Sequence, residues 1–475
     1  MRQFLVKNKY QIILWVLISA YIAYFSAFSI LRYRHLYAEY FDLGIMNQTV
    51  YNTYQAIKSG DMSRVLELTN PYGAEQIKRM AIHNDIILAF LAPFYFIHSG
   101  PETLLIIQTI VLALGAWAVY KIAQLKLKDD LVALAFAFAY LMYFPMQMAN
   151  IFEFHAVTFA TTFTLFMFYF WLKGRFKLSL LFLALALMTK EEVGLTLGMF
   201  GLYAGFQRLP KKQEEYLLPA IIILLSWGWA LASVFLIIPA FRGSQHFATS
   251  YYDGTLSNVK KYLFNLDTLN YLFFLLGPLA LLPLLAPIFI IIAEPEFAIN
   301  LFSSNLQLRS LVFHYISVIQ PWLFIGAIYG AKKVLNWRGF RLSTLLSAVI
   351  IFSSLLFSYL KSPLPYSLEK NIDPLVYDRS EEYQVVQKWT YRLAQDDIRV
   401  SSSDQIGPFF TSRRYFYVFS DDYKYADFVI VSLANAHYGY RKNITIPAYE
   451  KLKRDPMFEK VDGQSGYEVY RKRIN

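Results

Sequence analysis

The sequence predicts an α-helical polytopic membrane protein with a small soluble α/β domain at its C-terminus. Of its 475 residues, 56% are hydrophobic and 17% are charged, whereas about one quarter of the residues in a soluble protein are charged. The hydrophobic residues form long apolar runs, which are typical of membrane-spanning helices. Charged residues number 45 in positions 1–360 and 34 in positions 361–475. We therefore expect a transmembrane domain over 1–360 and a soluble domain over 361–475.

The composition also excludes several kinds of site and partner. The chain has no cysteine, so disulfides, thiolate zinc sites and cysteine nucleophiles are excluded. Its net charge of +11 would by itself suit nucleic-acid binding. The Lys and Arg residues, however, cluster in short loops between apolar runs, as the positive-inside rule describes for cytoplasmic loops. We therefore expect membrane lipids, and no nucleic acid, as partners.

The basic loops predict a topology in the cell membrane. The apolar run 11–31 follows a basic N-terminus and is too long for the core of a signal peptide, so we interpret it as a first spanning helix with a cytoplasmic start. Four basic clusters separate later apolar runs: Lys126 and Lys128; Lys173, Arg175 and Lys177; Arg208, Lys211 and Lys212; and Lys332, Lys333, Arg338 and Arg341. If all four are cytoplasmic, the outer side receives the loop 33–85, the turns 151–155, 189–192 and 309–314, and the C-terminal domain.

Two apolar runs do not fit a simple crossing. The run 86–97 contains a proline and is short of the roughly twenty residues that a spanning helix needs. We interpret it as a re-entrant or interfacial segment on the outer side, which leaves about eleven spanning helices. The run 178–207 contains three consecutive charges at 190–192, and a charge at the bilayer centre costs about 2.5–3.5 kcal/mol. We therefore predict two short helices that meet there and leave a water-filled dip.

The C-terminal part predicts an open α/β sheet, because short apolar strands alternate with helical patterns. Helices are expected over 380–394 and 448–453, and strands over 398–401, 415–419, 428–432 and 466–470. No glycine-rich phosphate loop or nucleophile elbow occurs in this part of the sequence. We interpret it as a supporting or substrate-capping domain.

The predicted topology brings polar residues from distant segments to one membrane face. They are Arg34 and Asp42 near the first helix, His83, Glu153 and His155, the tripeptide Lys190, Glu191 and Glu192, and His314. Carboxylates at such a face serve as a general base or bind a divalent cation. His, Lys and Arg side chains bind phosphate. A water-accessible dip would let an amphiphile keep its tail in the lipid while its head group reaches these residues, which suits transfer from a lipid-linked donor.

Simpler interpretations stay open for individual residues. Asp42 alternatively caps a juxtamembrane helix, as Asp often does. Glu153 and His155 are alternatively ordinary residues of an interfacial loop. We place Glu294 and Glu296 at a cytoplasmic helix turn and expect no functional role for them.

Three motifs resemble those of a family of predicted prokaryotic membrane proteins that is itself similar to the GT-C class of membrane glycosyltransferases. They are Phe41-Asp-Leu-Gly-Ile, Phe152-Glu-Phe-His and Lys190-Glu-Glu-Val-Gly. The resemblance covers most of positions 10–330. It implies a catalytic role for Asp42, as general base or metal ligand, and places Glu153 at the second acidic position. The acidic dipeptide usual in GT-C enzymes is absent, because Phe41 and Leu43 flank Asp42, and this departure puts the need for a metal in question.

We thus expect a glycosyltransferase that moves a hexosyl or pentosyl group from a polyprenyl-phosphate donor to an unidentified acceptor on the non-cytoplasmic face. Asp42, Glu153 and Glu192 are the expected catalytic residues. Arg34, His83, His155, Lys190, Glu191 and His314 are expected to bind substrate. Asp42 and Glu153 are the expected ligands if a cation, Mg²⁺ or Mn²⁺, is required. A transporter or lipid flippase with a polar site near the outer face is the alternative, because short broken helices and intramembrane charges also suit that class.

Overall fold

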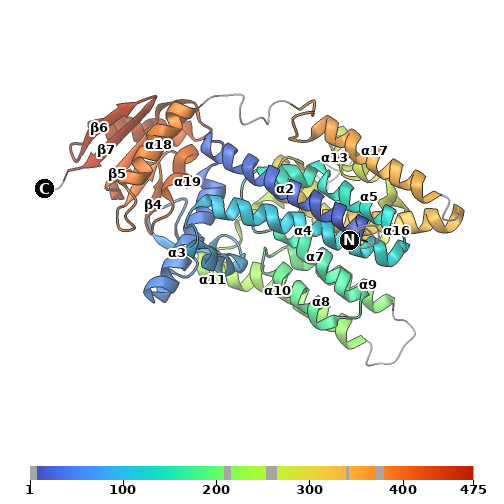
Figure 1. The fold of residues 1–475 in the computed structure, drawn as a ribbon. Helices are drawn as coiled ribbons and strands as arrows, with labels where there is room; N and C mark the ends of the chain where they lie inside the picture. Colours follow the sequence, from blue (N-terminus) through green and yellow to red (C-terminus); the bar gives the residue numbers. More distant parts are fainter. Residues whose placement is uncertain (1–7, 208–215, 253–264, 339–341, 370–378, 474–475) are drawn as a thin grey trace.

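The computed structural model describes residues 8–207, 216–252, 265–338, 342–369 and 379–473 (Figure 1). The basic residues Arg208, Lys211, Lys212 and Arg341, which support the predicted topology, lie outside these ranges. Most of the described chain is helical, and the sheet lies at one end of the molecule.

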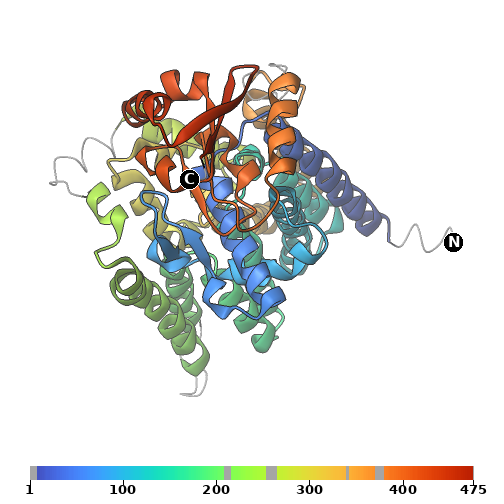
Figure 2. The ribbon, with the colours of Figure 1, turned by 90° about the vertical axis from the view of Figure 1, so that its left-hand side faces the viewer.

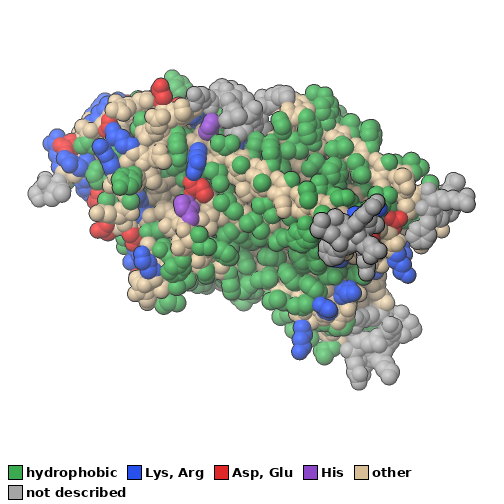
Figure 3. All heavy atoms as spheres, viewed as in Figure 1, with side chains coloured by type: hydrophobic (Ala, Val, Ile, Leu, Met, Phe, Trp, Pro, Cys, Tyr) green, Lys and Arg blue, Asp and Glu red, His purple; other side chains and the backbone are tan. Residues whose placement is uncertain are grey.

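Apolar helices of different lengths form the body of the protein. Their bounds are α2 Lys9–Arg34, α4 Pro101–Leu127, α5 Asp130–Leu141, α6 Phe144–Ile151, α7 Thr158–Leu172, α8 Phe176–Leu187, α9 Val193–Phe206, α10 Leu217–Ala232, α11 Ile238–Arg242, α13 Leu266–Leu276, α14 Ile288–Ile292, α15 Glu294–Phe302, α16 Gln320–Arg338 and α17 Ser343–Lys361. Figure 3 shows a broad hydrophobic band over these helices, with charged side chains gathered toward the two ends of the molecule. Such a band is what a lipid-facing surface requires, because hydrocarbon offers no partner for a charge.

Fewer helices are long enough to cross a bilayer than the eleven predicted. Within the described ranges, four segments are both long and apolar enough, and a fifth arises if the bent pair α5–α6 counts as one span. Five further apolar helices have 10–17 residues. An α-helix rises 1.5 Å per residue, so helices such as α7, α8 and α9 cover only about 18–22 Å of a core about 30 Å thick. A polar turn adjoins one end of each: 151–155 precedes α7, and 189–192 lies between α8 and α9.

Two predicted breaks can be compared directly with the structure. The prediction that 178–207 forms two helices is confirmed, because α8 ends at Leu187 and α9 begins at Val193. The run 86–97 forms an 11-residue 3-10 helix, Ile86–Phe96. At about 2.0 Å per residue it extends about 22 Å, less than the hydrocarbon thickness. Whether this segment enters the membrane from one side stays a prediction.

The C-terminal domain is a five-stranded mixed sheet with helices. Its elements are α18 Ser380–Arg392, β3 Val400–Ser402, α19 Gly407–Phe410, β4 Phe416–Val418, β5 Phe428–Ser432, α20 Leu433–Tyr438, α21 Lys442–Arg454, β6 Phe458–Gln464 and β7 Tyr467–Lys472. The strand order is β4-β3-β5-β7-β6, with β3 parallel to β4 and β5 and with β7 antiparallel to β5 and β6. The predicted open α/β sheet is confirmed. The sequence missed β6, because most of this edge strand is exposed and lacks an apolar alternation.

The segment between α2 and α4 packs against this domain. It contains a π-helical turn at Tyr40–Gly44, α3 Ile45–Ser59 and a small hairpin of β1 Glu67–Thr69 and β2 Gln76–Lys78. Figure 2 shows α3 and the sheet next to each other at the same end of the molecule. The N-terminal start of α2 and the adjoining ends of α16 and α17 lie toward the opposite end (Figure 1). This arrangement agrees with the predicted parity, while the assignment of one end to the cytoplasm stays a prediction.

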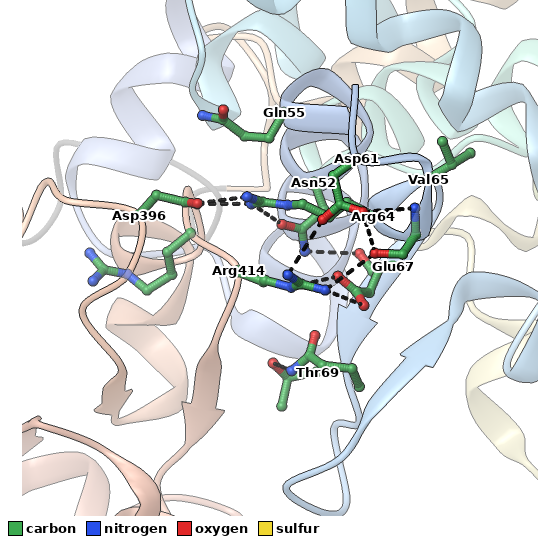
Figure 4. Close-up of polar contacts among 12 residues, drawn as sticks. Asn52, Gln55, Asp61, Arg64, Val65, Glu67, Thr69, Asp396 and Arg414 are labelled. Atoms are coloured by element: carbon green, nitrogen blue, oxygen red, sulfur yellow. Dashed lines mark hydrogen bonds and ion pairs between the residues drawn. The ribbon is translucent and has the colours of Figure 1, made fainter. Parts of the chain in front are cut away.

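Ion pairs join the two parts. Arg64 contacts Asp396 at 2.7 Å and also donates to Asn52, and Arg414 lies 3.1 Å from Glu67. Figure 4 shows these contacts side by side. Because Arg64 and Glu67 are both largely buried, the contacts are better shielded from water than ordinary surface pairs, whose net stabilisation is small.

Candidate active site

A cavity of about 590 Å³ lies where the predicted polar segments meet. Its polar part is lined by Asp42, His83, His155, the turn 189–192 and His314. Its apolar part is lined by α9, α10 and the π-helical turn Ser233–Ile237, including Leu231 and Phe235, which are 55% and 68% exposed on the outer surface of the protein. The cavity therefore runs from ionisable side chains to a surface that lipid would cover.

Asp42 faces this cavity from the π-helical turn Tyr40–Gly44. Its Oδ1 lies 3.1 Å from Nε2 of His155, and its side chain is 34% exposed while that of His155 is 6% exposed. The His155 ring stacks on that of His314, with 3.7 Å between the ring centroids. Burial lowers the pKa of His314, and the neighbouring His155 and Lys190 lower it further. His314 is therefore a neutral ring that fixes the plane of His155.

Glu153 does not line the cavity but supports the turn that carries Asp42. Its Oε1 accepts a hydrogen bond from the Glu39 N–H at 3.0 Å, and its Oε2 accepts one from the Leu43 N–H at 2.8 Å. Both amides lie at the start of the helical segment, where no preceding carbonyl is in reach. The backbone of Glu153 has φ +147°, a conformation that L-residues rarely adopt. The structure thus places Glu153 as a support for Asp42.

Gln108 on α4 holds the turn that contains Glu153 and His155. Its Nε2 donates to the carbonyl oxygens of Asn150 and Glu153, and its Oε1 accepts from the His155 N–H at 2.8 Å. Gln108 is fully buried, and a buried amide with all these bonds made is costly to disturb.

The break between α8 and α9 contributes a second group of charges. Nζ of Lys190 lies 2.7 Å from Oε1 of Glu192 and 6.0 Å from the centre of the Tyr315 ring. Burial disfavours the charge of Lys190, but Glu192 and Glu191 outweigh it and raise its pKa. Lys190 is therefore a permanent cation inside the cavity. Glu296 of α15 also lines the cavity and is 3% exposed.

Glu191 forms the third group, with two histidines. Its Oε1 lies 2.6 Å from Nδ1 of His83 and 3.0 Å from Nε2 of His246, and its Oε2 accepts from the Asn84 N–H. Burial alone would raise the pKa of Glu191, but His83 and His246 hold it well below its usual range. This carboxylate is therefore ionised.

Within the described chain, these three side chains are the group whose spacing would suit a metal ion. The Ala248 N–H donates to Nδ1 of His246, so Nδ1 carries no proton. The ring proton therefore lies on Nε2, and this Nε2–H points at Glu191. A metal on Nε2 would require this tautomer to change. The hydrogen bonds therefore favour a carboxylate held by two histidines.

A cation on Asp42 and Glu153 does not fit the arrangement. Both carboxylate oxygens of Glu153 already accept backbone N–H groups, and this residue lies outside the cavity lining. Asp42 would then be the single acidic ligand of the pair, and one carboxylate together with substrate oxygens is within the range that protein-bound Mg²⁺ uses. The involvement of a divalent cation stays a prediction.

The comparisons with known proteins agree with this fold. The family model described as "Predicted membrane protein (DUF2079)" matches residues 32–473. The chain belongs to this family.

A search of curated proteins finds no match. Two crystal structures of ArnT from Cupriavidus metallidurans are similar in fold. The one bound to undecaprenyl phosphate has a TM-score of 0.54 at 12% identity, and covers 95% of this chain and 98% of ArnT. The apo state has a TM-score of 0.53 at 12% identity over the same shares. The predicted GT-C-like fold is confirmed.

Most of the residues predicted for the site meet in this DUF2079 protein. Asp42, His155, Lys190, Glu191, Glu192, His83 and His314 line one cavity, with Glu153 directly behind it. Arg34 does not line the cavity and its side chain is exposed. It is the last residue of α2, and its charge acts on Tyr33 and Tyr383.

Sequence reasoning missed Glu296 and His246, which line the cavity, and Asp404, which contacts the turn that carries Asp42. Glu296 was placed in a cytoplasmic turn, and this placement was wrong, because α15 approaches the same cavity as Lys190. Its Glu-Pro-Glu start within an apolar region was the signal. His246 and Asp404 gave no signal of their own, because each is a single polar residue in a polar stretch.

Proposed function

We propose that this protein is a membrane glycosyltransferase that takes a sugar from a polyprenyl-phosphate-linked donor. The observation that carries the proposal is the single cavity with a charged part around Asp42 and Lys190 and an apolar part along α10. An amphiphile with a phosphate head group matches both parts. The fold shared with ArnT supports the proposal, since one ArnT structure holds undecaprenyl phosphate.

The apolar tail of the donor would lie along Leu231, Val234 and Phe235, which line the cavity and lie on or beside the π-helical turn. Such turns interrupt a helix and are frequent at functional sites. The Lys190 ammonium would contact the donor phosphate, because it has three donors and Glu192 occupies one of them. Neutralising the phosphate makes it a better leaving group, since negative charge builds up on its oxygen as the bond breaks.

Asp42 would act as the general base. Its Oδ1 faces His155, which leaves Oδ2 to accept the proton of the acceptor hydroxyl. The acceptor oxygen then forms a bond to the anomeric carbon while the bond from that carbon to the phosphate oxygen breaks. The electron pair of the broken bond leaves with the polyprenyl phosphate, and the proton stays on Asp42. A single displacement of this kind inverts the anomeric carbon.

Turnover of lipid-linked sugars tests this function. Asp42→Asn keeps the size of the side chain and its contact with His155 but removes the base, so transfer should fall about a thousandfold with unchanged insertion and donor binding. Asp421→Ala, an exposed change in the C-terminal domain, is the matched control. Transfer by Asp42→Asn at the wild-type rate would refute the role of Asp42.

A transporter or flippase is the competing function, and proteoliposomes separate the two. Movement of a fluorescent polyprenyl-phosphate sugar between leaflets, with no new glycoside formed, would contradict the transferase. Release of free polyprenyl phosphate together with a glycosylated product would support it.

A further inference from the structure

The turn that carries Asp42 is held from two sides, by the membrane domain and by the C-terminal domain. Glu153 of the membrane domain accepts the N–H groups of Glu39 and Leu43. Asp404 of the C-terminal domain accepts the N–H of Tyr40 at 2.9 Å, from 364 residues away in the sequence. The first amides of a helix have no carbonyl partner within it. Here two carboxylates from separate domains satisfy three of them.

The surroundings of Asp404 are built for this contact. Its side chain is 3% exposed, and its second oxygen accepts the Tyr440 hydroxyl at 2.6 Å. Gly407 lets the backbone of the C-terminal domain approach that of Tyr40 closely, because a Cβ placed on Gly407 would lie only 2.6 Å from the Tyr40 Cβ. The Arg441 guanidinium lies 5.0 Å from the centre of the Phe41 ring. The C-terminal domain therefore touches both residues that immediately precede Asp42.

These contacts decide what the Asp42 carboxylate does. An acidic residue three positions after the N-cap, as Asp42 is after Glu39, can reach back to the N-cap N–H with its own side chain. In this protein Glu153 and Asp404 occupy the amides, so the Asp42 carboxylate turns to the cavity and meets His155. Negative charge beside the start of a helix is also favourable, because the helix dipole is positive there.

We propose that Asp404 is a positioning residue for Asp42 and that the C-terminal domain thereby completes the active site. This inference rests on the proposed role of Asp42 as the base. It gives the domain a part in the reaction through Asp42, since the domain supplies one of the two carboxylates that hold the turn on which Asp42 lies.

The domain is attached through other contacts as well, so the positioning role can be tested separately from docking. Arg64 pairs with Asp396, Arg414 pairs with Glu67, and Tyr33 stacks on Phe409 with 4.2 Å between ring centroids. The first two of these contacts lie beside α3 and the β1–β2 hairpin (Figure 4). Removing the Asp404 side chain leaves all three in place.

The experiment uses the full-length protein in lipid nanodiscs with Asp404→Ala, Asp404→Asn and the control Asp421→Ala. Asn keeps an oxygen for the Tyr40 N–H and can donate to the Tyr440 oxygen, so it should restore most of the function. We expect Asp404→Ala to speed hydrogen exchange of the peptide that covers Tyr40–Gly44 at least tenfold. We also expect it to lower kcat at least tenfold with the donor KM changed less than twofold. Asp404→Asn should stay within threefold of wild type in both.

The two measurements separate this inference from the proposed function. If wild-type protein transfers no sugar from any lipid-linked donor, the proposed function fails, and hydrogen exchange still decides whether Asp404 holds the turn. Exchange at Tyr40–Gly44 that is unchanged in Asp404→Ala overturns the inference. Faster exchange with a wild-type kcat in an active preparation also overturns it, because the turn would then move without consequence for the base. An equal loss in the Asn variant would point to the charge instead of the hydrogen bond and would overturn the capping argument.

Discussion

Replacing Glu153 tests the support of the catalytic turn from the membrane side. Glu153→Ala leaves the buried N–H groups of Glu39 and Leu43 without their acceptors. An unsatisfied buried donor costs about 1–3 kcal/mol, so the two together cost about 2–6 kcal/mol. Each 1.4 kcal/mol is about a factor of ten in an equilibrium constant, so the equilibrium between the ordered and the displaced turn should shift at least about thirtyfold toward the displaced turn. Glu153→Gln keeps one oxygen acceptor and should cost roughly half as much free energy.

The assay is turnover of a lipid-linked sugar together with thermal unfolding in the same lipid nanodiscs. We expect Glu153→Ala to lower kcat at least thirtyfold, Glu153→Gln to lower it about fivefold, and the donor KM to change little in either. The shape of the pH–rate profile should persist, because Asp42 remains the base in both variants. A Glu153→Ala protein with wild-type kcat and wild-type unfolding temperature would refute the support role. Loss of one limb of the pH–rate profile would assign the base to Glu153.

Three further predictions follow from the same geometry. Burial, Asp404 and Asp42 raise the pKa of Glu39 to about 7, so the folded state favours the neutral acid. The free energy of unfolding should therefore fall as pH rises from about 4.5 to 7, by at most about 3 kcal/mol. In Glu39→Gln the unfolding temperature should depend less on pH over this range. Leu231→Trp should narrow the apolar part of the cavity and raise the KM several-fold for long-chain donors but not for short-chain analogues. Leu224 also lies on α10 but does not line the cavity, so Leu224→Trp should leave the KM of both kinds of donor unchanged. Treatment with EDTA tests the predicted divalent cation: turnover that is lost and then restored by Mg²⁺ or Mn²⁺ would confirm it, and Glu153, whose two carboxylate oxygens accept backbone N–H groups, is not expected among its ligands.

The sequence predicted the fold class because its signals are local. Apolar runs, basic loops and the rise in charge after position 360 each lie within a few tens of residues. The polar turns at 151–155 and 189–192 were found for the same reason, since each interrupts an apolar run. The count of about eleven spans stays a prediction, because α7, α8 and α9 are apolar but shorter than a full span in the described residues.

Residue roles were harder to predict, because they depend on contacts between distant segments. Glu153 and Asp42 are 111 positions apart, and nothing in either motif shows that the glutamate caps the aspartate's own turn. Asp404 lies in a polar stretch of the C-terminal domain, where one more aspartate carries no information. The sequence left open whether Asp42 is a helix cap or a base. The structure assigns the capping of this turn to Glu153 and Asp404.

The charges of the cavity fit a phosphate-linked donor only because most of its acids are paired. Five carboxylates line it, those of Asp42, Asp85, Glu191, Glu192 and Glu296, against the two permanent cations Arg79 and Lys190. Asp85 is bound by Arg79, Glu191 by two histidines and Glu192 by Lys190. Arg79 and Asp85 are both 3% exposed, so breaking that pair would leave a buried charge and cost several kcal/mol, about 3–5. Lys190 can exchange Glu192 for a phosphate at lower cost, since its side chain is 15% exposed to the cavity. The donor phosphate is therefore expected at Lys190, with Asp42 left to face the acceptor.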